Sequence, residues 1–492
     1  MSNLYLPNLI IFREYYFPIA ILSVYCITQL GTSGDKVPRF IRLGNAGIRG
    51  IVGSGLNLRR TSNYCSALAT WTNGGKILIG CDTRQSTPFL KSIALSSFIA
   101  AGSEIIDCGI LPAPTVQYLV QKLNASGGCL IGASHHGLGW NAILPLNSSG
   151  ACAKSGEHQD ILNILHSRQF KLEAWDKLGS VNELEESYIE SYIDEIFTGI
   201  DLKKLSKAKL KVVIDCCNGS ASTIVKRIFE KVGVTAVTLN DELDSYLPHS
   251  PEPRPRTAYQ TKALLETINA DIGFVLNSDA TRVSIVTSNG ETLSEELTFP
   301  LVTQSLLDKE TEPQTIISNV CTTRSLEKVA EAHGSHVIKV PVGQSSAVDS
   351  LFENNALVAG DGMGSVAFNS KVAGFDAFRS MLVIIEAMAL KAKTSTELIE
   401  EFPRYQIYKS KIRCESSKAF AVIQRCTELF EDVVSTDKTD GTRFEWEDGW
   451  IHLRVSETEP VLRLISEWPS LEKAREKAEY VKRAIMRTLS HE

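Results

Sequence analysis

The chain has 492 residues, of which 43% are hydrophobic and 22% are charged, and its formal net charge is −6. These values are typical of a globular protein with roughly three or four domains. They argue against nucleic acid as a partner, because the sequence contains no long basic run. The 11 cysteines form no Cys-x-x-Cys pair and no cluster with zinc spacing, which favours free thiols in a reducing, cytoplasmic compartment.

The N-terminal segment differs from the rest of the chain. Tyr15 to Leu30 is uncharged and mostly apolar, but a membrane span needs about 20 such residues, and no clear signal-peptide cleavage site follows. A signal-peptide core, a membrane anchor and an artefact of the assigned start are the alternatives. We expect residues 1–37 to be an extension outside the fold, and we expect no membrane partner.

The first folded unit opens with a glycine-rich stretch, Leu43-Gly44-Asn45-Ala46-Gly47-Ile48-Arg49-Gly50. Three glycines around Arg49 predict a tight loop that presents a guanidinium to a phosphate; the alternative is a turn with a solvated arginine. Strand and helix patterns then alternate, which predicts an α/β domain. The expected elements are a strand over 76–80, a helix over 88–101, a strand at 105–106 and a helix over 116–123.

Ser134 follows a short apolar run, Cys129 to Ile131, which predicts a buried strand. The small residues Gly132 and Ala133 allow a sharp turn, so Ser134 should be exposed at the carboxyl end of this strand. In an open α/β sheet this edge binds ligands, and a hydroxyl next to His135 can carry a phosphoryl or acyl group. The alternative is a turn serine beside a surface histidine.

A second α/β unit carries a polar loop, Asn277 to Arg282, between apolar runs at 271–276 and 283–286. The oxygen atoms in such a loop suit a hard cation; the alternative is a simple hairpin turn. A third unit, from Leu293 to about Thr394, contains the glycine-rich stretch Ala359 to Ser365 around Asp361. Three units of similar strand and helix content predict a coarse internal repeat.

From Pro403 the pattern changes to alternating strands followed by a helix over 471–489. This part contains Arg454-Val455-Ser456-Glu457-Thr458-Glu459-Pro460, followed by Arg463. Arginine, serine and threonine at alternate positions, together with backbone amides, predict a phosphate-binding loop.

Taken in order, these stretches resemble the α-D-phosphohexomutases, which include phosphoglucomutase, phosphomannomutase and phosphoglucosamine mutase. The family signatures T-A-S-H-N-P, D-G-D-G/A-D-R, G-E-x-S/N-G and R-P-S-G-T-E-P correspond to residues 132–137, 277–282, 360–364 and 454–460. The family's opening G-T-S-G-I-R-G corresponds to Gly44 to Gly50, and Pro251-Glu252-Pro253 is similar to a family linker. The resemblance covers essentially the whole chain after Arg39.

The resemblance implies three similar α/β domains with mixed sheets and a C-terminal α+β domain of the TATA-binding-protein type. We expect domain I over 38–180, domain II over 181–291, domain III over 292–402 and domain IV over 403–492.

The resemblance also implies interconversion of a hexose 1-phosphate and a hexose 6-phosphate through a phosphoserine and a bisphosphate intermediate. Ser134, His135, Arg49 and Arg282 would be catalytic, and Ser134, Asn277, Asp279 and Thr281 would hold Mg²⁺. Asp361, Gly362, Gly364 and Ser365 would bind the sugar, and Arg454, Ser456, Thr458 and Arg463 the distant phosphate. Hexose 1,6-bisphosphate would be the activator, and the protein a monomer or dimer.

The sequence departs from the family signatures at the residues expected to bind the metal and the sugar. Asn277 and Thr281 replace two of three metal-binding aspartates, Asp361 replaces a glutamate, and Met363 and His136 replace smaller polar residues. Losing two carboxylates should lower the affinity for Mg²⁺. Three hypotheses follow: an active mutase with weakened metal binding, an impaired paralogue that binds phosphosugars or a protein partner, and a phosphatase-like hydrolase.

Overall fold

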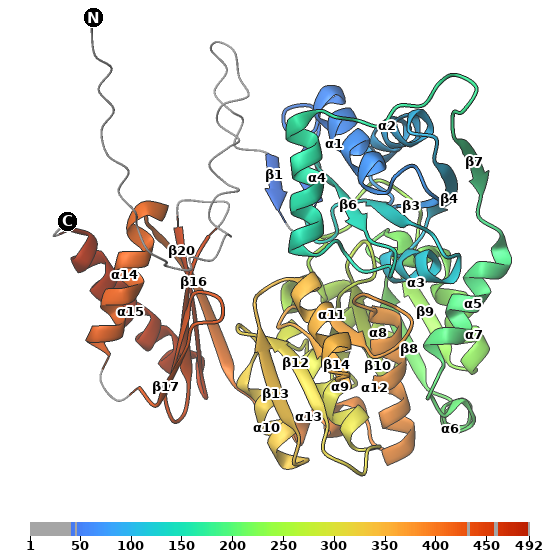
Figure 1. Cartoon of the computed structure of the whole chain (residues 1–492). Helices are drawn as coiled ribbons and strands as arrows, with labels where there is room; N and C mark the ends of the chain where they lie inside the picture. The colour runs from blue at the N-terminus through green and yellow to red at the C-terminus, as the bar shows by residue number, and fades with distance from the viewer. Residues whose placement is uncertain (1–40, 45–46, 431–432, 457–460, 491–492) are drawn as a thin grey trace, which may run out of the picture. The chain divides into compact units, whose positions relative to one another are not determined.

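The computed structural model describes residues 41–44, 47–430, 433–456 and 461–490 (Figure 1). The expected extension over residues 1–37 lies outside the described residues. Three α/β sheets follow one another along the chain, and an antiparallel sheet with two long helices ends it. Within the described residues, no helix combines the length and the apolar character that crossing a membrane requires.

The first sheet has seven strands in the order β1-β2-β6-β5-β3-β4-β7. The strands are β1 (Ile41–Gly44), β2 (Gly47–Ile51), β3 (Ile77–Cys81), β4 (Glu104–Ile110), β5 (Gly127–Ile131), β6 (Trp140–Leu146) and β7 (Ser180–Glu183). Their helices are α1 (Leu58–Trp71), α2 (Thr87–Ala100), α3 (Ala113–Lys122) and α4 (Ser155–Ser167). Because β7 pairs with β4, this sheet reaches Glu183, three residues past the expected domain boundary.

Alternation along β3 explains how both faces of this sheet are buried. Ile77 and Ile79 pack into the core beneath α1 and α2, whereas Leu78 belongs to the core on the α3 side. A strand covered by helices on both faces must be apolar at every position. The continuous run Ile77 to Cys81 satisfies this requirement.

The second and third sheets have four strands each, in the orders β11-β10-β8-β9 and β13-β12-β14-β15. The second unit contains α5 (Glu186–Ile196), α6 (Leu202–Ala208), β8 (Lys211–Asp215), η3 (Ser220–Thr223), α7 (Val225–Val232), β9 (Thr235–Leu239), η4 (Pro255–Thr257), α8 (Tyr259–Ile268), β10 (Ile272–Leu276) and β11 (Val283–Thr287). The third contains η5 (Glu295–Leu297), α9 (Thr298–Leu307), β12 (Thr315–Asn319), α10 (Arg324–Ala332), β13 (His336–Val340), α11 (Gln344–Glu353), β14 (Val358–Gly360), β15 (Val366–Phe368), α12 (Ala377–Lys391) and α13 (Ser395–Glu400).

The internal repeat expected from the sequence is present in the sheet topology. Each unit contains four strands in the same arrangement: β6-β5-β3-β4 in the first, β11-β10-β8-β9 in the second and β15-β14-β12-β13 in the third. When these four strands are numbered 1 to 4 along the chain, without β1, β2 and β7 of the first unit, the order is 4-3-1-2 in all three. The fourth strand is antiparallel to the third in every unit, and the other neighbours are parallel. Each unit therefore turns sharply between its third and fourth strands, at the carboxyl end of the third.

The C-terminal unit is a five-stranded antiparallel sheet in the order β16-β20-β19-β18-β17. Its elements are β16 (Gln406–Arg413), α14 (Ser416–Leu429), β17 (Ser435–Asp437), β18 (Thr442–Glu445), β19 (Trp450–Val455), β20 (Val461–Trp468) and α15 (Leu471–Ser490). Helix α15 packs on β16 and β20 and contacts α14. The fold class expected from the sequence, three mixed α/β units and an α+β unit, is confirmed.

Candidate functional site

The repeat gives the site its frame, because the three loops singled out in the sequence occupy the same topological place. Ser134 lies between β5 and β6, Asn277 to Arg282 between β10 and β11, and Asp361 to Ser365 between β14 and β15. Hydrogen bonds join them: Asn277 Nδ2 donates to Ser134 Oγ at 3.0 Å, and the Val283 N–H to the Gly364 carbonyl at 2.9 Å. The structure thus brings the predicted serine, cation and sugar loops together.

Ser134 adopts a left-handed backbone conformation, with φ of 50°. A non-glycine residue in this region is strained and persists only where its surroundings hold it. Its carbonyl accepts hydrogen bonds from Arg84 Nη2 at 3.1 Å and Ser278 Oγ at 2.8 Å. The preceding N–H, of Ala133, donates to Asp82 Oδ2 at 3.1 Å. The backbone on both sides of the half-buried serine is therefore held by hydrogen bonds.

Arg84 is the main support of the Ser134 loop. It is 5% exposed and forms a 2.9 Å ion pair with buried Asp82. Its guanidinium also donates to a set of carbonyls across the loop, those of Ser134, His136, Gly137 and Trp140. Sequence reasoning missed this role of Arg84, because nothing local links it to a loop about 50 residues later. Ser86, the N-cap residue of α2, forms no side-chain cap hydrogen bond.

Two arginines, Arg49 and Arg282, lie close to the histidines that follow the serine. Arg49 Nη1 lies 3.5 Å from His136 Nε2, and burial, followed by repulsion from Arg282, lowers the pKa of Arg49 to about 10. Burial and the nearby arginines lower the pKa of His136 to about 3, and that of His135 also falls. Both imidazoles are therefore neutral at pH 7.

Several buried nitrogen atoms in this cluster lack a hydrogen-bond partner, namely Arg49 Nε, Arg282 Nη1 and His135 Nδ1. Arg282 Nη1 forms an ion pair with Glu252 at 3.7 Å, which is too long for a hydrogen bond. A buried donor without an acceptor is costly unless a ligand supplies one. The cluster therefore suits an anion with several oxygen atoms, such as a phosphoryl group.

The predicted cation loop forms a closed hydrogen-bond network. Asn277 Nδ2 lies 2.7 Å from Asp279 Oδ1 and 3.0 Å from Thr281 Oγ1, and Thr281 Oγ1 donates to Asp279 Oδ1 at 2.7 Å. The described residues contain no group of three His, Cys, Asp or Glu side chains that could hold a metal ion. The residues predicted to bind Mg²⁺ are brought together, but Asn277 faces Ser134 through its amino group.

The sugar loop is shaped by its own carboxylate and by a buried acid. Asp361 Oδ1 accepts the Met363 N–H at 2.9 Å, and a Cβ on Gly362 would lie 2.0 Å from Glu296 Oε2. Gly364 has φ of +81°, so it tolerates no side chain beside the Val283 carbonyl. Ser365, also predicted to bind the sugar, is fully buried, and its Oγ has no hydrogen-bond partner among the described residues.

Glu296, which the sequence did not single out, links this loop to the C-terminal unit. Lys409 of β16 donates to Glu296 Oε1 at 2.7 Å and lies 3.9 Å from the Met363 sulfur. Burial raises the pKa of Glu296 to about 8, against the opposing attraction of Lys409. A contact between residues so distant in sequence leaves no periodic signal that could have revealed it.

The predicted phosphate loop lies at the β19–β20 turn. Arg454 and Arg463 are direct cross-strand partners, so their side chains lie on the same face of the sheet. Asp440 holds Arg454 Nε at 3.0 Å. The Ser456 N–H donates to the Val461 carbonyl at 3.0 Å. Thr458, also predicted to bind phosphate, lies outside the described residues.

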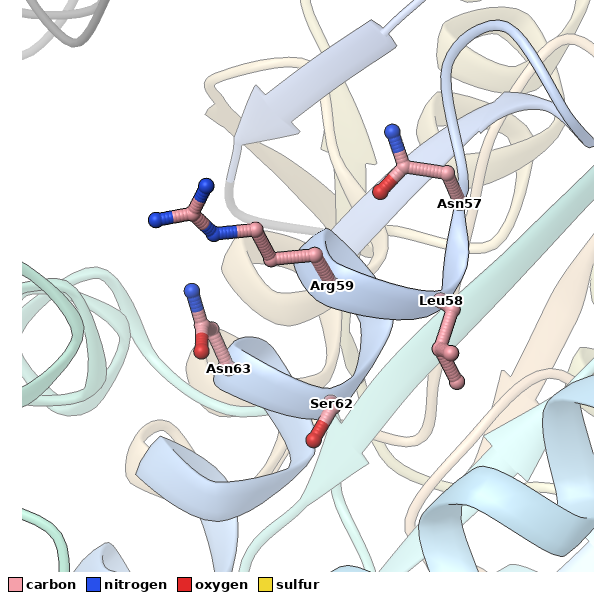
Figure 2. A pocket seen from close by; sticks show the side chains of 5 residues that line it. All are labelled: Asn57, Leu58, Arg59, Ser62 and Asn63. Atoms are coloured by element: carbon pink, nitrogen blue, oxygen red, sulfur yellow. The ribbon is translucent and has the colours of Figure 1, made fainter.

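A hollow on the first turns of α1 is separate from these loops in its lining (Figure 2). It is lined by Asn57, Leu58, Arg59, Ser62 and Asn63. None of the residues predicted from the sequence to act in catalysis or binding is among them, so this hollow adds nothing to the site described above.

Comparisons with known proteins agree with this architecture. The sequence matches the phosphoglucomutase/phosphomannomutase alpha/beta/alpha domain I over residues 41–172, domain II over 190–290 and domain III over 295–405. A phosphoglucomutase/phosphomannomutase of Thermococcus kodakarensis is 31% identical over 81% of this chain and 87% of its own. A "Probable phosphoglucosamine mutase" of Methanothermobacter thermautotrophicus is 30% identical over 90% of this chain and 96% of its own.

Solved structures share the fold. A phosphoglucomutase/phosphomannomutase family protein from Burkholderia thailandensis has a TM-score of 0.79 at 23% identity, covering 90% of this chain and 98% of its own. Aspergillus fumigatus N-acetylphosphoglucosamine mutase in complex with GlcNAc-6P and magnesium has a TM-score of 0.52 at 13% identity, covering 83% and 82%. The same fungal enzyme has been solved with glucose 1,6-bisphosphate, with a TM-score of 0.54 at 12% identity, covering 93% and 96%. From the three domain matches and the relative with 31% identity, the chain belongs to the phosphoglucomutase/phosphomannomutase family, the α-D-phosphohexomutases.

Proposed function

We propose that this protein is a phosphohexomutase that interconverts a hexose 1-phosphate and a hexose 6-phosphate, with Ser134 as the carrier of the phosphoryl group. The observation that carries the proposal is the strained, half-buried Ser134, whose loop lies in a cluster with two buried arginine donors that lack hydrogen-bond partners, Arg49 Nε and Arg282 Nη1. Such donors suit phosphoryl transfer, in which positioning and electrostatic stabilisation supply most of the catalysis.

In the transfer step, Ser134 Oγ forms a bond to the phosphorus of a hexose bisphosphate while the phosphorus–oxygen bond to the sugar breaks. The serine proton ends on the sugar oxygen, which regenerates the phosphoserine and releases the isomerised hexose monophosphate. Earlier in the cycle, the phosphoserine has given its phosphoryl group to the free hydroxyl of the incoming hexose monophosphate, and the proton of that hydroxyl has passed to Ser134 Oγ. Arg49 and Arg282 stabilise the negative charge on the transferring group. Neutral His135 supplies a hydrogen bond. Because its pKa is lowered, the protonation state of its imidazole does not change with pH near neutrality.

The sugar and the distant phosphate are assigned to the other loops. We propose that Asp361, with the backbone of Gly362 and Gly364, contacts sugar hydroxyls, and that Arg454, Ser456, Thr458 and Arg463 bind the phosphate that does not react. The relatives' names span glucose, mannose and glucosamine phosphates, and the fungal relative has been solved with glucose 1,6-bisphosphate. We therefore propose a hexose phosphate as substrate and hexose 1,6-bisphosphate as activator.

The test is the intact mass of the purified full-length protein after incubation with glucose 1,6-bisphosphate. The wild type should gain the mass of one phosphoryl group, and Ser134→Ala should not. Ser92→Ala, a substitution on the exposed side of α2, is the matched control and should gain the group like the wild type. A wild type that takes up no phosphoryl group would refute the proposal.

Activity is then measured with the 1-phosphates of glucose, mannose and glucosamine, and the Ser134→Ala variant should be inactive with all three. If the protein binds these phosphosugars but never takes up a phosphoryl group, it is a binding protein that has lost the family reaction.

A further inference from the structure

Three oxygen atoms beneath the phosphoryl site converge on one nitrogen. Asn277 Nδ2 lies 3.0 Å from Ser134 Oγ, 2.7 Å from Asp279 Oδ1 and 3.0 Å from Thr281 Oγ1. Asn277 is fully buried, whereas Ser134 and Asp279 are half-buried. The sequence places this residue where the family has a metal-binding aspartate.

The amide cannot turn its oxygen toward Ser134 without loss. Asn277 Oδ1 accepts two backbone N–H groups, those of Thr281 and Arg282, each at 3.0 Å. A rotation by 180° would set the amino group against these two donors and leave both without an acceptor. Each such loss costs about 1–3 kcal/mol, so the backbone of the loop fixes the amino group toward the serine.

This arrangement does not fit Mg²⁺, which takes oxygen ligands in a near-octahedral geometry. The amino group offers no lone pair and occupies the point where the oxygens converge. The one carboxylate, Asp279, uses its Oδ1 to accept hydrogen bonds from Asn277, from the Thr281 hydroxyl and, at 3.3 Å, from the Thr281 N–H. Its remaining oxygen, Oδ2, does not by itself make a ligand set for Mg²⁺. The oxygen that Asn277 could offer as a ligand is held by the backbone.

The balance of charge is preserved without the cation. Three carboxylates around a divalent cation leave one net negative charge, and Asp279 alone leaves the same. The losses at Asn277 and Thr281 therefore compensate for the loss of the ion. The positive charge of this region comes from Arg49 of β2 and Arg282 of the β10–β11 loop, whose Nε and Nη1 atoms, respectively, lack hydrogen-bond partners.

We propose that the amino group of Asn277 takes the place of the divalent cation at Ser134, so that phosphoryl transfer at this serine proceeds without Mg²⁺. The inference rests on the proposed function for the transfer itself, but its statement about the cation can be tested independently. Asn277 is then a catalytic residue, because it donates its hydrogen bond to the reacting oxygen.

Asn277→Asp is the decisive variant. A carboxylate keeps the acceptor for the Thr281 and Arg282 N–H groups, and sets a second negative oxygen against Asp279 in place of a donor. In EDTA this variant should unfold at a lower temperature than the wild type. Adding Mg²⁺ should raise its unfolding temperature and so remove the difference. The wild type should show the same unfolding temperature in EDTA and in Mg²⁺, and no heat of Mg²⁺ binding by calorimetry.

Asn289→Asp is the matched control. It makes the same change of charge in the same unit, on an exposed residue whose Oδ1 also accepts two hydrogen bonds, from the Thr287 hydroxyl and the Glu291 N–H. The unfolding temperature of Asn289→Asp should be the same in EDTA and in Mg²⁺. Heat of Mg²⁺ binding or Mg²⁺-dependent stabilisation in the wild type would overturn the inference, whether or not the Asn277→Asp variant folds.

Phosphoryl uptake from glucose 1,6-bisphosphate gives the second readout. The wild type should take up the group at the same rate in EDTA and in Mg²⁺, whereas Asn277→Asp should be at least about tenfold slower in EDTA. Uptake by the wild type only in Mg²⁺ would overturn this inference and leave the proposed function intact. No uptake in either buffer would refute the proposed function, and the Mg²⁺ titration would then decide the statement about the cation.

Discussion

Individual residues around Ser134 show how this serine is held in a strained backbone conformation. The left-handed backbone at Ser134 costs about 1–3 kcal/mol, and the buried Asp82–Arg84 pair opposes this cost by holding the loop carbonyls. Arg84 is buried, charged and distant from the loop in sequence. Its removal should therefore destabilise the serine loop more than the strands of the sheet.

We predict that Arg84→Met lowers the free energy of unfolding by about 3–5 kcal/mol, because Asp82 is left buried without its partner. Urea unfolding measures the loss, and hydrogen exchange of residues 132–140 should speed up. Arg59→Met, on the exposed face of α1, is the control and should change the free energy of unfolding by no more than about 0.5 kcal/mol. Equal effects of the two substitutions would show that Arg84 does not support the loop.

At the scale of elements, the three sheets with the strand order 4-3-1-2 place the three predicted functional loops in the same turn of each unit. The turn between the third and fourth strands carries the serine in the first unit, the Asn277 network in the second and the sugar loop in the third. Since all three turns lie at the carboxyl ends of their third strands, the repeat needs only to bring those ends together to assemble a site. In the C-terminal sheet, Arg454 of β19 and Arg463 of β20 are cross-strand partners on one face.

We predict that Arg454→Ala weakens the binding of glucose 6-phosphate at least about tenfold, because a charge-assisted hydrogen bond contributes roughly 1.5–3 kcal/mol. Calorimetry with glucose 6-phosphate and mannose 6-phosphate measures the change. Arg475→Ala removes an exposed arginine from α15 of the same unit and should leave the affinity unchanged. Identical affinities of wild type and Arg454→Ala would rule out the phosphate loop as a binding site.

At the scale of the whole molecule, the Glu296–Lys409 pair links the third and C-terminal units beside the sugar loop. Burial raises the pKa of Glu296 from its ordinary value of 4.5 to about 8. Between these values the folded protein holds a proton that the unfolded chain releases. The stabilising contribution of this group is therefore present below pH 4.5 and is lost as the pH rises to 8.

We predict that the free energy of unfolding falls between pH 5 and pH 8 in the wild type, and that Glu296→Gln makes this fall smaller. Urea unfolding at several pH values provides the measurement. Glu291→Gln removes a more exposed carboxylate, paired with Arg404, and should keep the slope of the wild type. A slope that Glu296→Gln leaves unchanged would show that Glu296 ionises normally in the folded protein.

Sequence by itself determined the fold class and the position of the loops that carry the chemistry. Apolar runs such as Ile77 to Cys81 and Ile272 to Leu276 predict buried strands because a sheet covered on both faces needs apolar residues at every position. Polar residues directly after such runs, like Ser134, are placed at the ligand-binding edge by the same argument. Local patterns are sufficient here because the signal lies within one strand and its turn.

Only the tertiary structure decided how those side chains are used. The amino group of Asn277 faces Ser134 because two backbone N–H groups hold its oxygen, and the hydrogen bond crosses 143 residues of sequence. Arg84 reaches the serine loop over 50 residues, and Lys409 reaches Glu296 over 113. Such contacts depend on the packing of whole units against one another, and no periodicity in the chain records the direction in which a buried amide or guanidinium points.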